Sequence, residues 1–253
     1  MKYIDVRNLN FCYDKKIIFK DLNFSINKVS LVSIITPSSS GKTTLLNILS
    51  GNLITNENVY INDKEINSKK KNKISMITPS INIFSKTILE DLLLVTSNTI
   101  RIKKILKEFG LIESINKSLS DLTYFELQKI NLIKTLLSKP EIILIDNIFS
   151  YFDKYSTIEY IGLIKKYQMD KGITVIFTST NLEDTIFSDK VIIIDKEKLY
   201  DGPIDKMYLN NKLIKQSKIK IPTENELIEK LKLYDVIDNI NYSIEEVVDE
   251  ICR

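Results

Sequence analysis

A strand, loop and helix pattern near the N-terminus constrains the fold of this chain more than any other segment. Residues 31–35 (L-V-S-I-I) resemble a buried strand, and residues 43–50 have the character of a helix. The loop between them, residues 36–44, is T-P-S-S-S-G-K-T-T, whereas nucleotide phosphate loops follow G-x-x-x-x-G-K-[S/T]. Thr36 therefore stands where the first glycine is expected. A plain polar turn is the alternative, but the flanking elements and the G-K-T-T core favour a nucleoside triphosphate site.

The phosphate loop, residues 36–44, retains the groups that hold phosphate. Backbone N–H groups at the start of the helix can face an anion, helped by the positive end of the helix dipole. Lys42 can reach the outer phosphates, and the Thr43 hydroxyl can bind Mg²⁺. Because a β-branched threonine resists backbone angles that glycine accepts, we expect Thr36 to change the loop's flexibility or weaken binding. The residues expected to contact the nucleotide here are Ser38, Ser39, Ser40, Gly41, Lys42, Thr43 and Thr44.

Composition narrows the class of protein. The chain has 253 residues, 43% of them hydrophobic, which is enough for a substantial core. Its 36 basic and 33 acidic residues give a net charge of +3, which does not favour nucleic acid as a partner. The two cysteines, Cys12 and Cys252, lie far apart and predict a reducing compartment rather than a disulfide framework. Apolar runs are strand-sized, well below the ~20 residues of a membrane helix. The absence of histidine excludes a histidine base or phosphate sensor.

Hydrophobic patterning predicts alternating strands and helices. Residues 88–137 are helical in pattern, with breaks at Gly110 and 118–123, and residues 157–168 form a further helix. This alternation predicts an α/β sandwich with crossover helices, and we place a soft boundary after Gly202-Pro203. The expected strands are 3–9, 17–26, 31–35, 59–61, 74–77, 142–145, 174–177 and 191–194.

A second half of the site follows from residues 142–146, I-I-L-I-D. In phosphate-loop proteins an aspartate at the end of such a buried strand orients Mg²⁺ beside the loop. We therefore predict that Thr43 and Asp146 form the metal site, with ATP and Mg²⁺ as the cofactors.

The chain here resembles the ATP-binding cassette (ABC) family, the ATPase subunits that drive membrane transporters. The resemblance covers about residues 3–202, with segments in matching order and spacing. It implies an α/β, P-loop NTPase (RecA-like) core with an N-terminal antiparallel β subdomain and an inserted helical subdomain at about 80–137. The nucleotide-binding domain would span 1–202, followed by a small C-terminal helical extension at 203–253.

The resemblance also implies roles for individual residues. Tyr13 stands where the family has an aromatic that stacks on adenine, although a strand-end tyrosine is also ordinary. Ser150 and Asp153 lie in a segment like the family's subunit contact (the D-loop). Residues 174–183 resemble the switch strand and the helix after it.

Three departures concern the activation of water. Asn147 replaces the family's glutamate, and a neutral amide cannot accept a proton. Thr180 replaces the switch histidine and is too short to span to a γ-phosphate, so we expect neither residue to act in catalysis. Thr78 and Pro79 stand near the position of a glutamine that completes the Mg²⁺ and water shell and senses the membrane partner.

The signature loop, residues 122–126, departs as well. The family has L-S-G-G-Q, and each subunit closes this loop on the nucleotide of a second, head-to-tail subunit. Unless this variable loop is misaligned, bulky rings and a carboxylate would hinder that approach sterically and electrostatically. The five residues of the loop here are Leu122, Thr123, Tyr124, Phe125 and Glu126.

The C-terminal tail carries two capping-box patterns, Thr223 with Glu226 and Ser243 with Glu246, each before an amphipathic stretch. The tail resembles that of ATPases from energy-coupling-factor (ECF) transporters, which import vitamins and metal ions. In those proteins the tail supports pairing between the two ATPases.

These features favour a degenerate ATP-binding subunit of a membrane transporter, binding Mg-ATP with impaired hydrolysis. Loss of a proton acceptor typically costs about 10²–10⁴-fold in rate. The implied partners are a second ABC ATPase, in a homo- or heterodimer, and a transmembrane transporter subunit at the inner face of the cell membrane, with the chain in the cytoplasm. The alternatives are a non-catalytic scaffold or regulatory pseudo-ATPase, and an active ATPase with unusual water positioning.

Overall fold

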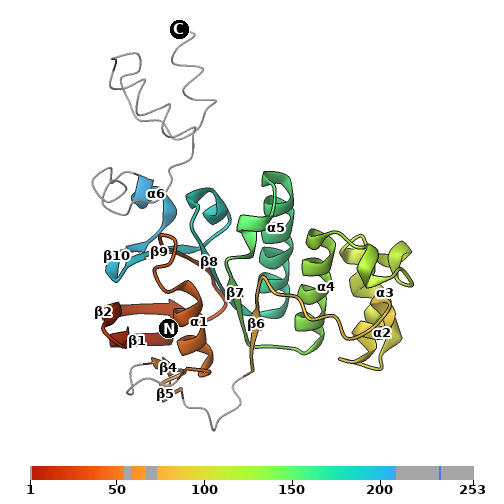
Figure 1. Cartoon of the computed structure of the whole chain (residues 1–253), viewed down its shortest axis with the longest axis horizontal. Helices are drawn as coiled ribbons and strands as arrows, with labels where there is room; N and C mark the ends of the chain where they lie inside the picture. The colour runs from red at the N-terminus through yellow and green to blue at the C-terminus, as the bar shows by residue number, and fades with distance from the viewer. Residues whose placement is uncertain (1, 54–58, 67–72, 209–233, 235–253) are drawn as a thin grey trace.

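The computed structural model describes residues 2–53, 59–66 and 73–208, together with Tyr234 (Figure 1). Two β-sheets and a group of helices make up this part of the chain. Figure 1 shows β1 and β2 at one end of the molecule and α2 and α3 at the other. The large sheet lies between them and positions the phosphate loop.

The large sheet has six strands in the order β10-β9-β3-β8-β7-β6. All neighbouring strands are parallel except β9 and β10, which are antiparallel. Strands β3, β7 and β8 are buried along their whole length, as expected for parallel strands covered on both faces. The bounds are β3 Leu31–Ile35, β6 Ile74–Ile77, β7 Ile142–Asp146, β8 Thr174–Ser179, β9 Lys190–Asp195 and β10 Glu197–Gly202.

The small sheet is antiparallel and has the order β2-β1-β4-β5. Helix α1 (Lys42–Ser50) packs its buried leucines in one apolar cluster with strands of both sheets. The helix that leaves the phosphate loop is therefore enclosed in the core, which holds the loop in place. The bounds are β1 Lys2–Tyr13, β2 Lys16–Asn27, β4 Val59–Ile61 and β5 Lys64–Glu65.

A second apolar cluster joins helices α2 to α5 to the large sheet. Side-chain caps start them: Thr87 and Thr123 form capping boxes with Glu90 and Glu126, and Asp153 caps α5. The helices are α2 Ile88–Leu93, α3 Thr99–Glu108, α4 Tyr124–Leu137, α5 Lys154–Lys171 and α6 Ile204–Tyr208, and short 3₁₀ segments lie at Ile112–Ser114, Leu119–Asp121, Ile148–Tyr151 and Leu182–Thr185.

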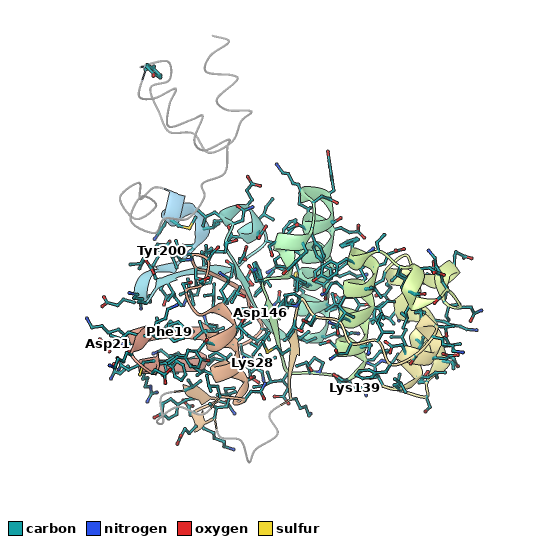
Figure 2. The ribbon with its side chains drawn as sticks, in the orientation of Figure 1. Phe19, Asp21, Lys28, Lys139, Asp146 and Tyr200 are labelled. Atoms are coloured by element: carbon teal, nitrogen blue, oxygen red, sulfur yellow. The ribbon has the colours of Figure 1, made fainter. Side chains whose placement is uncertain are left out.

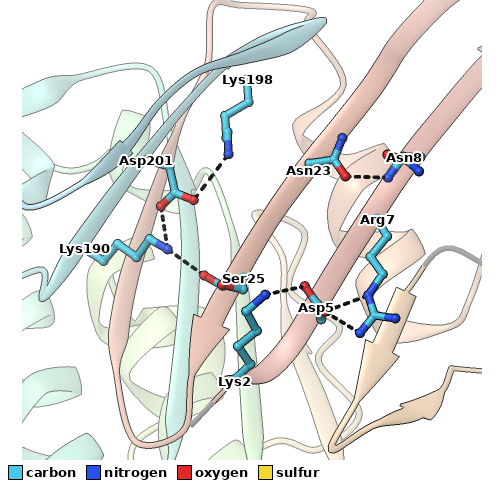
Figure 3. A network of polar contacts seen from close by, with 9 residues as sticks. All are labelled: Lys2, Asp5, Arg7, Asn8, Asn23, Ser25, Lys190, Lys198 and Asp201. Carbon is cyan, nitrogen blue, oxygen red and sulfur yellow. Dashed lines mark hydrogen bonds and ion pairs between the residues drawn. The ribbon is translucent and has the colours of Figure 1, made fainter.

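Polar contacts tie the two sheets together (Figure 3). Lys190 on β9 donates to the backbone oxygen of Ser25 on β2 at 2.6 Å and pairs with Asp201 on β10 at 2.5 Å. On β1, Asp5 pairs with Arg7 at 2.7 Å. The Lys190 ammonium thus links β2, β9 and β10, and fixes the small sheet against the strand beside β3.

The α/β prediction is confirmed, and the expected strands at 31–35, 59–61 and 74–77 have those bounds. The pattern missed β10 and the break after α2, where residues 94–98 separate it from α3. Past the boundary placed after Pro203, Met207 is buried with Ile35 and Ile193. The capping boxes at Thr223 and Ser243 lie outside the described residues.

In the described part of the chain, no helix combines the length and the apolar character needed to span a bilayer.

Candidate nucleotide-binding site

The phosphate loop connects the carboxyl end of β3 to α1. Gly41 precedes α1 with φ +98°, and the Leu45 amide donates to its carbonyl at 2.8 Å. A Cβ built on Gly41 would lie 2.4 Å from Ile18 Cγ2 and 2.9 Å from Phe19 Cζ. Both the left-handed backbone and the close approach of β2 therefore require glycine at this position.

The chain at Thr36 continues the extended course of β3, and the turn of the loop comes after it. Its side chain is buried, and its amide donates to the carbonyl of Ser179 at 3.1 Å, continuing the pairing of β3 with β8. Within residues 36–44, the positive φ angles fall on Ser39 (59°) and Gly41 (98°). The backbone at Thr36 therefore does not need glycine, which removes the steric reason for expecting a change there. That Thr36 alters the loop's flexibility or weakens nucleotide binding stays a prediction.

Lys42 lies folded over the loop. Its Nζ donates to the carbonyl of Pro37 at 2.9 Å and to both the carbonyl and the Oγ1 of Thr36 at 3.4 Å. Burial lowers the pKa of Lys42, and the charge of Asp146 acts in the opposite direction. All three oxygens are neutral, so the ammonium group retains a charge that a phosphate can compensate.

The predicted metal pair is in contact although its members lie far apart in sequence. Thr43 Oγ1 donates to Asp146 Oδ2 at 2.6 Å, and Thr178 Oγ1 donates to the other carboxylate oxygen at 3.2 Å. Asp146 is buried at the end of β7, near the middle of the molecule (Figure 2). A hydroxyl and a carboxylate this close can bind one Mg²⁺ ion, which prefers oxygen ligands. The residues present therefore fit a Mg-nucleotide.

Tyr13, at the end of β1, also reaches this site. Its hydroxyl lies 3.5 Å from Thr44 Oγ1, and Phe11 packs edge-on against its ring with centroids 4.9 Å apart. The side chain of Tyr13 is 49% exposed, which leaves ring surface open to a ligand. The structure thus places an aromatic ring beside the start of α1.

Asn147 follows Asp146 in the left-handed conformation, with φ 47°. Its amide nitrogen Nδ2 donates to Ser150 Oγ at 3.2 Å, and the Ser150 hydroxyl donates to the Asn147 carbonyl at 2.9 Å. Among the described residues, no group donates to the buried Oδ1 of Asn147. Asn147 and Ser150 are therefore mutually bonded, and the amide offers no basic group.

The segment after β8 contains a buried carboxyl group, Asp184, that is bonded to Ser179, the residue before Thr180. The Asn181 amide donates to Ser179 Oγ at 3.0 Å, and the Ser179 hydroxyl donates to Asp184 Oδ2. Burial raises the pKa of Asp184 to about 6, with the Ser179 hydrogen bond acting against it and the charge of Glu183 adding to it. Thr180 directly follows β8, and the carboxyl end of β8 lies beside the end of β7 that carries Asp146.

In the signature loop, the Glu126 carboxylate and Thr123 form a capping box at the start of α4. Glu126 Oε2 accepts from the Thr123 amide and from Thr123 Oγ1, both at 2.8 Å. In return the Glu126 amide donates to Thr123 Oγ1 at 3.2 Å. These hydrogen bonds lower the pKa of Glu126. The amides of Thr123 and Glu126 at the start of α4 are therefore bonded within the chain.

The two rings of the signature loop pack against their own chain. Phe125 lies edge-on to Phe152 with centroids 5.1 Å apart, and Lys129 Nζ lies 4.9 Å from its centroid. The Tyr124 hydroxyl donates to the carbonyl of Pro79 at 3.1 Å. Leu122, just before the cap, is buried in the core. We expected both rings to occupy the approach surface, whereas Phe125 is directed into the core.

Asp153, the second residue of the predicted subunit contact, caps α5. Its two carboxylate oxygens accept from the amide and the hydroxyl of Ser156 at 2.8 and 2.9 Å, which lowers the pKa of Asp153. This local role is compatible with a surface contact because Asp153 is exposed.

Two residues at the site were missed from the sequence. Gln128 is fully buried and its Nε2 donates to the carbonyl of Thr78 at 3.0 Å and to the Tyr124 hydroxyl at 2.9 Å. Its spacing of four from Tyr124 on one helix was the available signal. Thr178, which bonds Asp146, could be found from its place at the end of the neighbouring strand.

Comparisons with known proteins agree with this geometry. The model of the family described as ABC transporter matches residues 19–150. The energy-coupling factor transporter ATP-binding protein EcfA1 of Oenococcus oeni is 26% identical over 250 residues, covering 92% of this chain and 90% of that protein. The zinc import ATP-binding protein ZnuC of Ehrlichia ruminantium is 28% identical over 221 residues, covering 84% and 88%.

Solved structures show the same fold. cbiO1 from Clostridium perfringens, part of the ABC transporter complex cbiONQ, has a TM-score of 0.77 at 19% identity, covering 90% of this chain and all of that one. A nucleotide-free ATP-binding cassette from an ABC transporter has a TM-score of 0.72 at 19% identity, covering 85% and 98%. These likenesses confirm the predicted P-loop NTPase fold.

Proposed function

This chain belongs to the ABC transporter family as an ATP-binding subunit, and we propose that it binds Mg-ATP with impaired hydrolysis in an importer of the energy-coupling-factor type. One observation carries the proposal. Lys42 and the Thr43–Asp146 pair are assembled for a Mg-triphosphate, while the residue after Asp146 is an asparagine bonded to Ser150.

Binding uses groups that the structure brings together. Lys42 exchanges its hydrogen bonds to neutral loop carbonyls for phosphate oxygens, and the first amides of α1 face the same anion. Thr43 and Asp146 would hold Mg²⁺, and Tyr13 would offer its ring to the base. When bound, Mg-ATP supplies the phosphoanhydride bond and the charge that the metal neutralises.

Hydrolysis is impaired because two positions where the family carries water-activating residues hold Asn147 and Thr180. The Asn147 amide cannot take a proton, and Thr180 has only a short hydroxyl. Absence of a general base corresponds to about 10²–10⁴-fold in rate. Nucleotide binding then serves assembly and conformational change more than turnover.

A second ABC ATPase is the proposed partner across the signature loop, in a homo- or heterodimer. The Glu126 carboxylate already occupies the Thr123 amide at the start of α4. A γ-phosphate approaching from the partner would compete with that carboxylate and be repelled by its charge. We therefore propose that the nucleotide bound to the partner gains little from this loop, so that closure over the partner's site is weak.

A groove beside α2 and α4 is the proposed contact for a transmembrane subunit. Its volume is about 210 Å³, and it lies along the segment after β6 that includes Thr78. Phe84 in its lining is 74% exposed and Ile83 is 47% exposed. The likeness to EcfA1 and to cbiO1 of the cbiONQ complex supports a membrane partner, with the chain in the cytoplasm at the inner face of the membrane.

Calorimetry with Mg-ATP tests the nucleotide site. We expect the wild-type chain to bind, Lys42→Ala to lose binding, and Lys103→Ala, an exposed lysine on α3, to bind normally. If the wild-type chain shows no binding, the chain is a scaffold.

Steady-state hydrolysis tests the impairment. We expect the purified chain to be nearly inactive. Robust turnover that disappears in Lys42→Ala would instead establish an active ATPase with another way of positioning water.

Association with membranes tests the groove. Phe84→Asp should reduce recovery of the chain in the membrane fraction of its source cells, whereas Ile100→Asp, at an 81% exposed position on α3, should not. Equal recovery of both variants would exclude Phe84 from the contact.

A further inference from the structure

A second cavity, separate from the nucleotide site, lies between α3, the end of α4 and the end of α5. Its volume is about 710 Å³. Pro140 and Ile173 in its lining come just before β7 and β8, so the cavity opens at the amino ends of these strands. Asp146 lies at the opposite end of β7, and Figure 2 shows Lys139 well apart from it.

The lining of this cationic cavity carries excess positive charge. It has five cationic side chains and two carboxylates, Glu108 and Asp170, which leaves three positive charges unmatched. An excess of positive charge in a concave site attracts and orients anions. The cationic side chains are Arg101, Lys104, Lys139, Lys166 and Lys171.

One of the two carboxylates is already engaged. The Tyr167 hydroxyl donates to Glu108 at 2.5 Å, and Lys166 pairs with the same carboxylate at 3.6 Å. The hydrogen bond from Tyr167 lowers the pKa of Glu108, so this group stays ionised and satisfied. Glu108 therefore forms its ion pair with Lys166, and the charge of Lys104 also acts on it without an ion pair within 4.0 Å.

The remaining cations have no such partner. Within the described residues, no carboxylate lies within 4.0 Å of the ammonium groups of Lys104, Lys139 or Lys171. Arg101 donates to the carbonyls of Leu136 and Leu137 at 3.1 and 3.2 Å, and both acceptors are neutral. These four cations line the cavity together with Asp170, the second carboxylate, so three positive charges are left unmatched.

The floor of the cavity is apolar. Ile105, Leu136, Tyr167 and Ile173 line it, and each is between 5% and 7% exposed. The Tyr167 ring is held by Phe109, with centroids 5.6 Å apart. A ligand there would meet carbon at the base and cationic groups around the rim.

We propose that this cationic cavity binds a small organic anion with at least two acid groups on an apolar body. Its volume is in the range of sites for such molecules, about 300–1,000 Å³. A bare inorganic anion would leave the floor uncovered, and an uncharged apolar molecule would leave the rim unmatched. The ligand would contact α3, α4 and α5 together, and so bridge the predicted helical subdomain to the large sheet.

Calorimetry with naphthalene-2,6-dicarboxylate as the probe tests the site in the full-length chain. The test variant is Lys104→Glu/Lys171→Glu, which reverses two rim charges. The control is Lys103→Glu/Lys107→Glu, which makes the same charge change outside the lining. Lys107 and Lys171 both lie in the last turn of their helices, so the two variants disturb the helix dipoles alike.

We expect the wild-type chain and the control to bind the probe with equal affinity, and the test variant to bind at least tenfold more weakly. Circular dichroism and Mg-ATP binding should be unchanged in both variants. The monoacid 2-naphthoate should bind more weakly than the diacid, and inorganic phosphate should not displace the probe.

Several outcomes would overturn the proposal. These are no probe binding to the wild-type chain at millimolar concentration, equal binding by the two double variants, or displacement by inorganic phosphate. Loss of probe binding in Lys42→Ala would also overturn it, because the probe would then occupy the phosphate loop. Binding of the probe is measured without ATP. The outcome for this cavity therefore does not depend on whether the chain hydrolyses ATP.

Discussion

The buried carboxyl group of Asp184 makes stability depend on pH in an unusual direction. Asp184 is 6% exposed, and burial raises its pKa from 3.8 to about 6. A carboxyl group whose pKa is higher in the folded state favours folding while it is protonated. This contribution is fully present below the unfolded pKa near 4 and is lost as pH rises through about 6.

The magnitude follows from the size of the shift. A rise of about two units corresponds to about 3 kcal/mol between the two protonation states. Between about pH 7.5 and pH 5 the protonation of Asp184 should add about 1.4 kcal/mol to the free energy of unfolding. Asp184→Asn is always neutral and can still accept the hydrogen bond from Ser179. It should therefore lack this contribution, and be more stable than the wild-type chain at pH 7.5 by up to about 3 kcal/mol.

Urea unfolding at the two pH values measures this difference. The chain has no tryptophan, so far-ultraviolet circular dichroism provides the signal. Other groups titrate in both proteins, and the difference between the wild-type chain and Asp184→Asn isolates the single carboxyl group. If both proteins change equally between pH 7.5 and pH 5, the buried carboxyl group does not titrate as the structure indicates.

Three further substitutions test other contacts. Gly41→Ala should abolish Mg-ATP binding in calorimetry, because its Cβ would meet β2 at 2.4 Å and φ is +98°; normal affinity would contradict the loop geometry. Tyr124→Phe should lower the free energy of unfolding by about 1 kcal/mol, since the Pro79 carbonyl loses a donor, and no change in urea unfolding would refute this. Lys134→Met should cost about 3 kcal/mol in urea unfolding, because it leaves buried Asp91 without its cation at 2.8 Å, and an unchanged free energy of unfolding would contradict that cause.

The sequence could predict the local parts of the site because each is written in consecutive residues. The phosphate loop and its helix follow from G-K-T-T after an apolar run, and Asp146 follows from an apolar run that ends in an acid. The caps at Thr123 and Asp153 also depend on residues only three positions away, although we expected the helix after Asp153 to begin at residue 157 and not at 154. These short-range patterns can be recognised without knowing which strands lie beside them.

The effect of Thr36 could not be judged from the motif alone. Its φ angle depends on the pairing of its amide with Ser179, a residue 143 positions later. The direction of the Phe125 ring likewise depends on Phe152 and Lys129 in the packed core. The identity of a substituted motif residue shows which chemical group is present. Whether that residue causes a steric conflict can be judged only when the packing around it is known.

The sequence by itself determined an α/β chain with a phosphate loop, an acidic strand end and no base in the place where the family carries one. Only the tertiary structure decided which distant groups meet. It joined Thr178 to Asp146 and Gln128 to Thr78, and it brought the lysines of α3 and α5 around one cavity. The physical reason is that local hydrogen bonds and hydrophobic periodicity act within a few residues, whereas strand order and helix packing act between segments far apart in the chain.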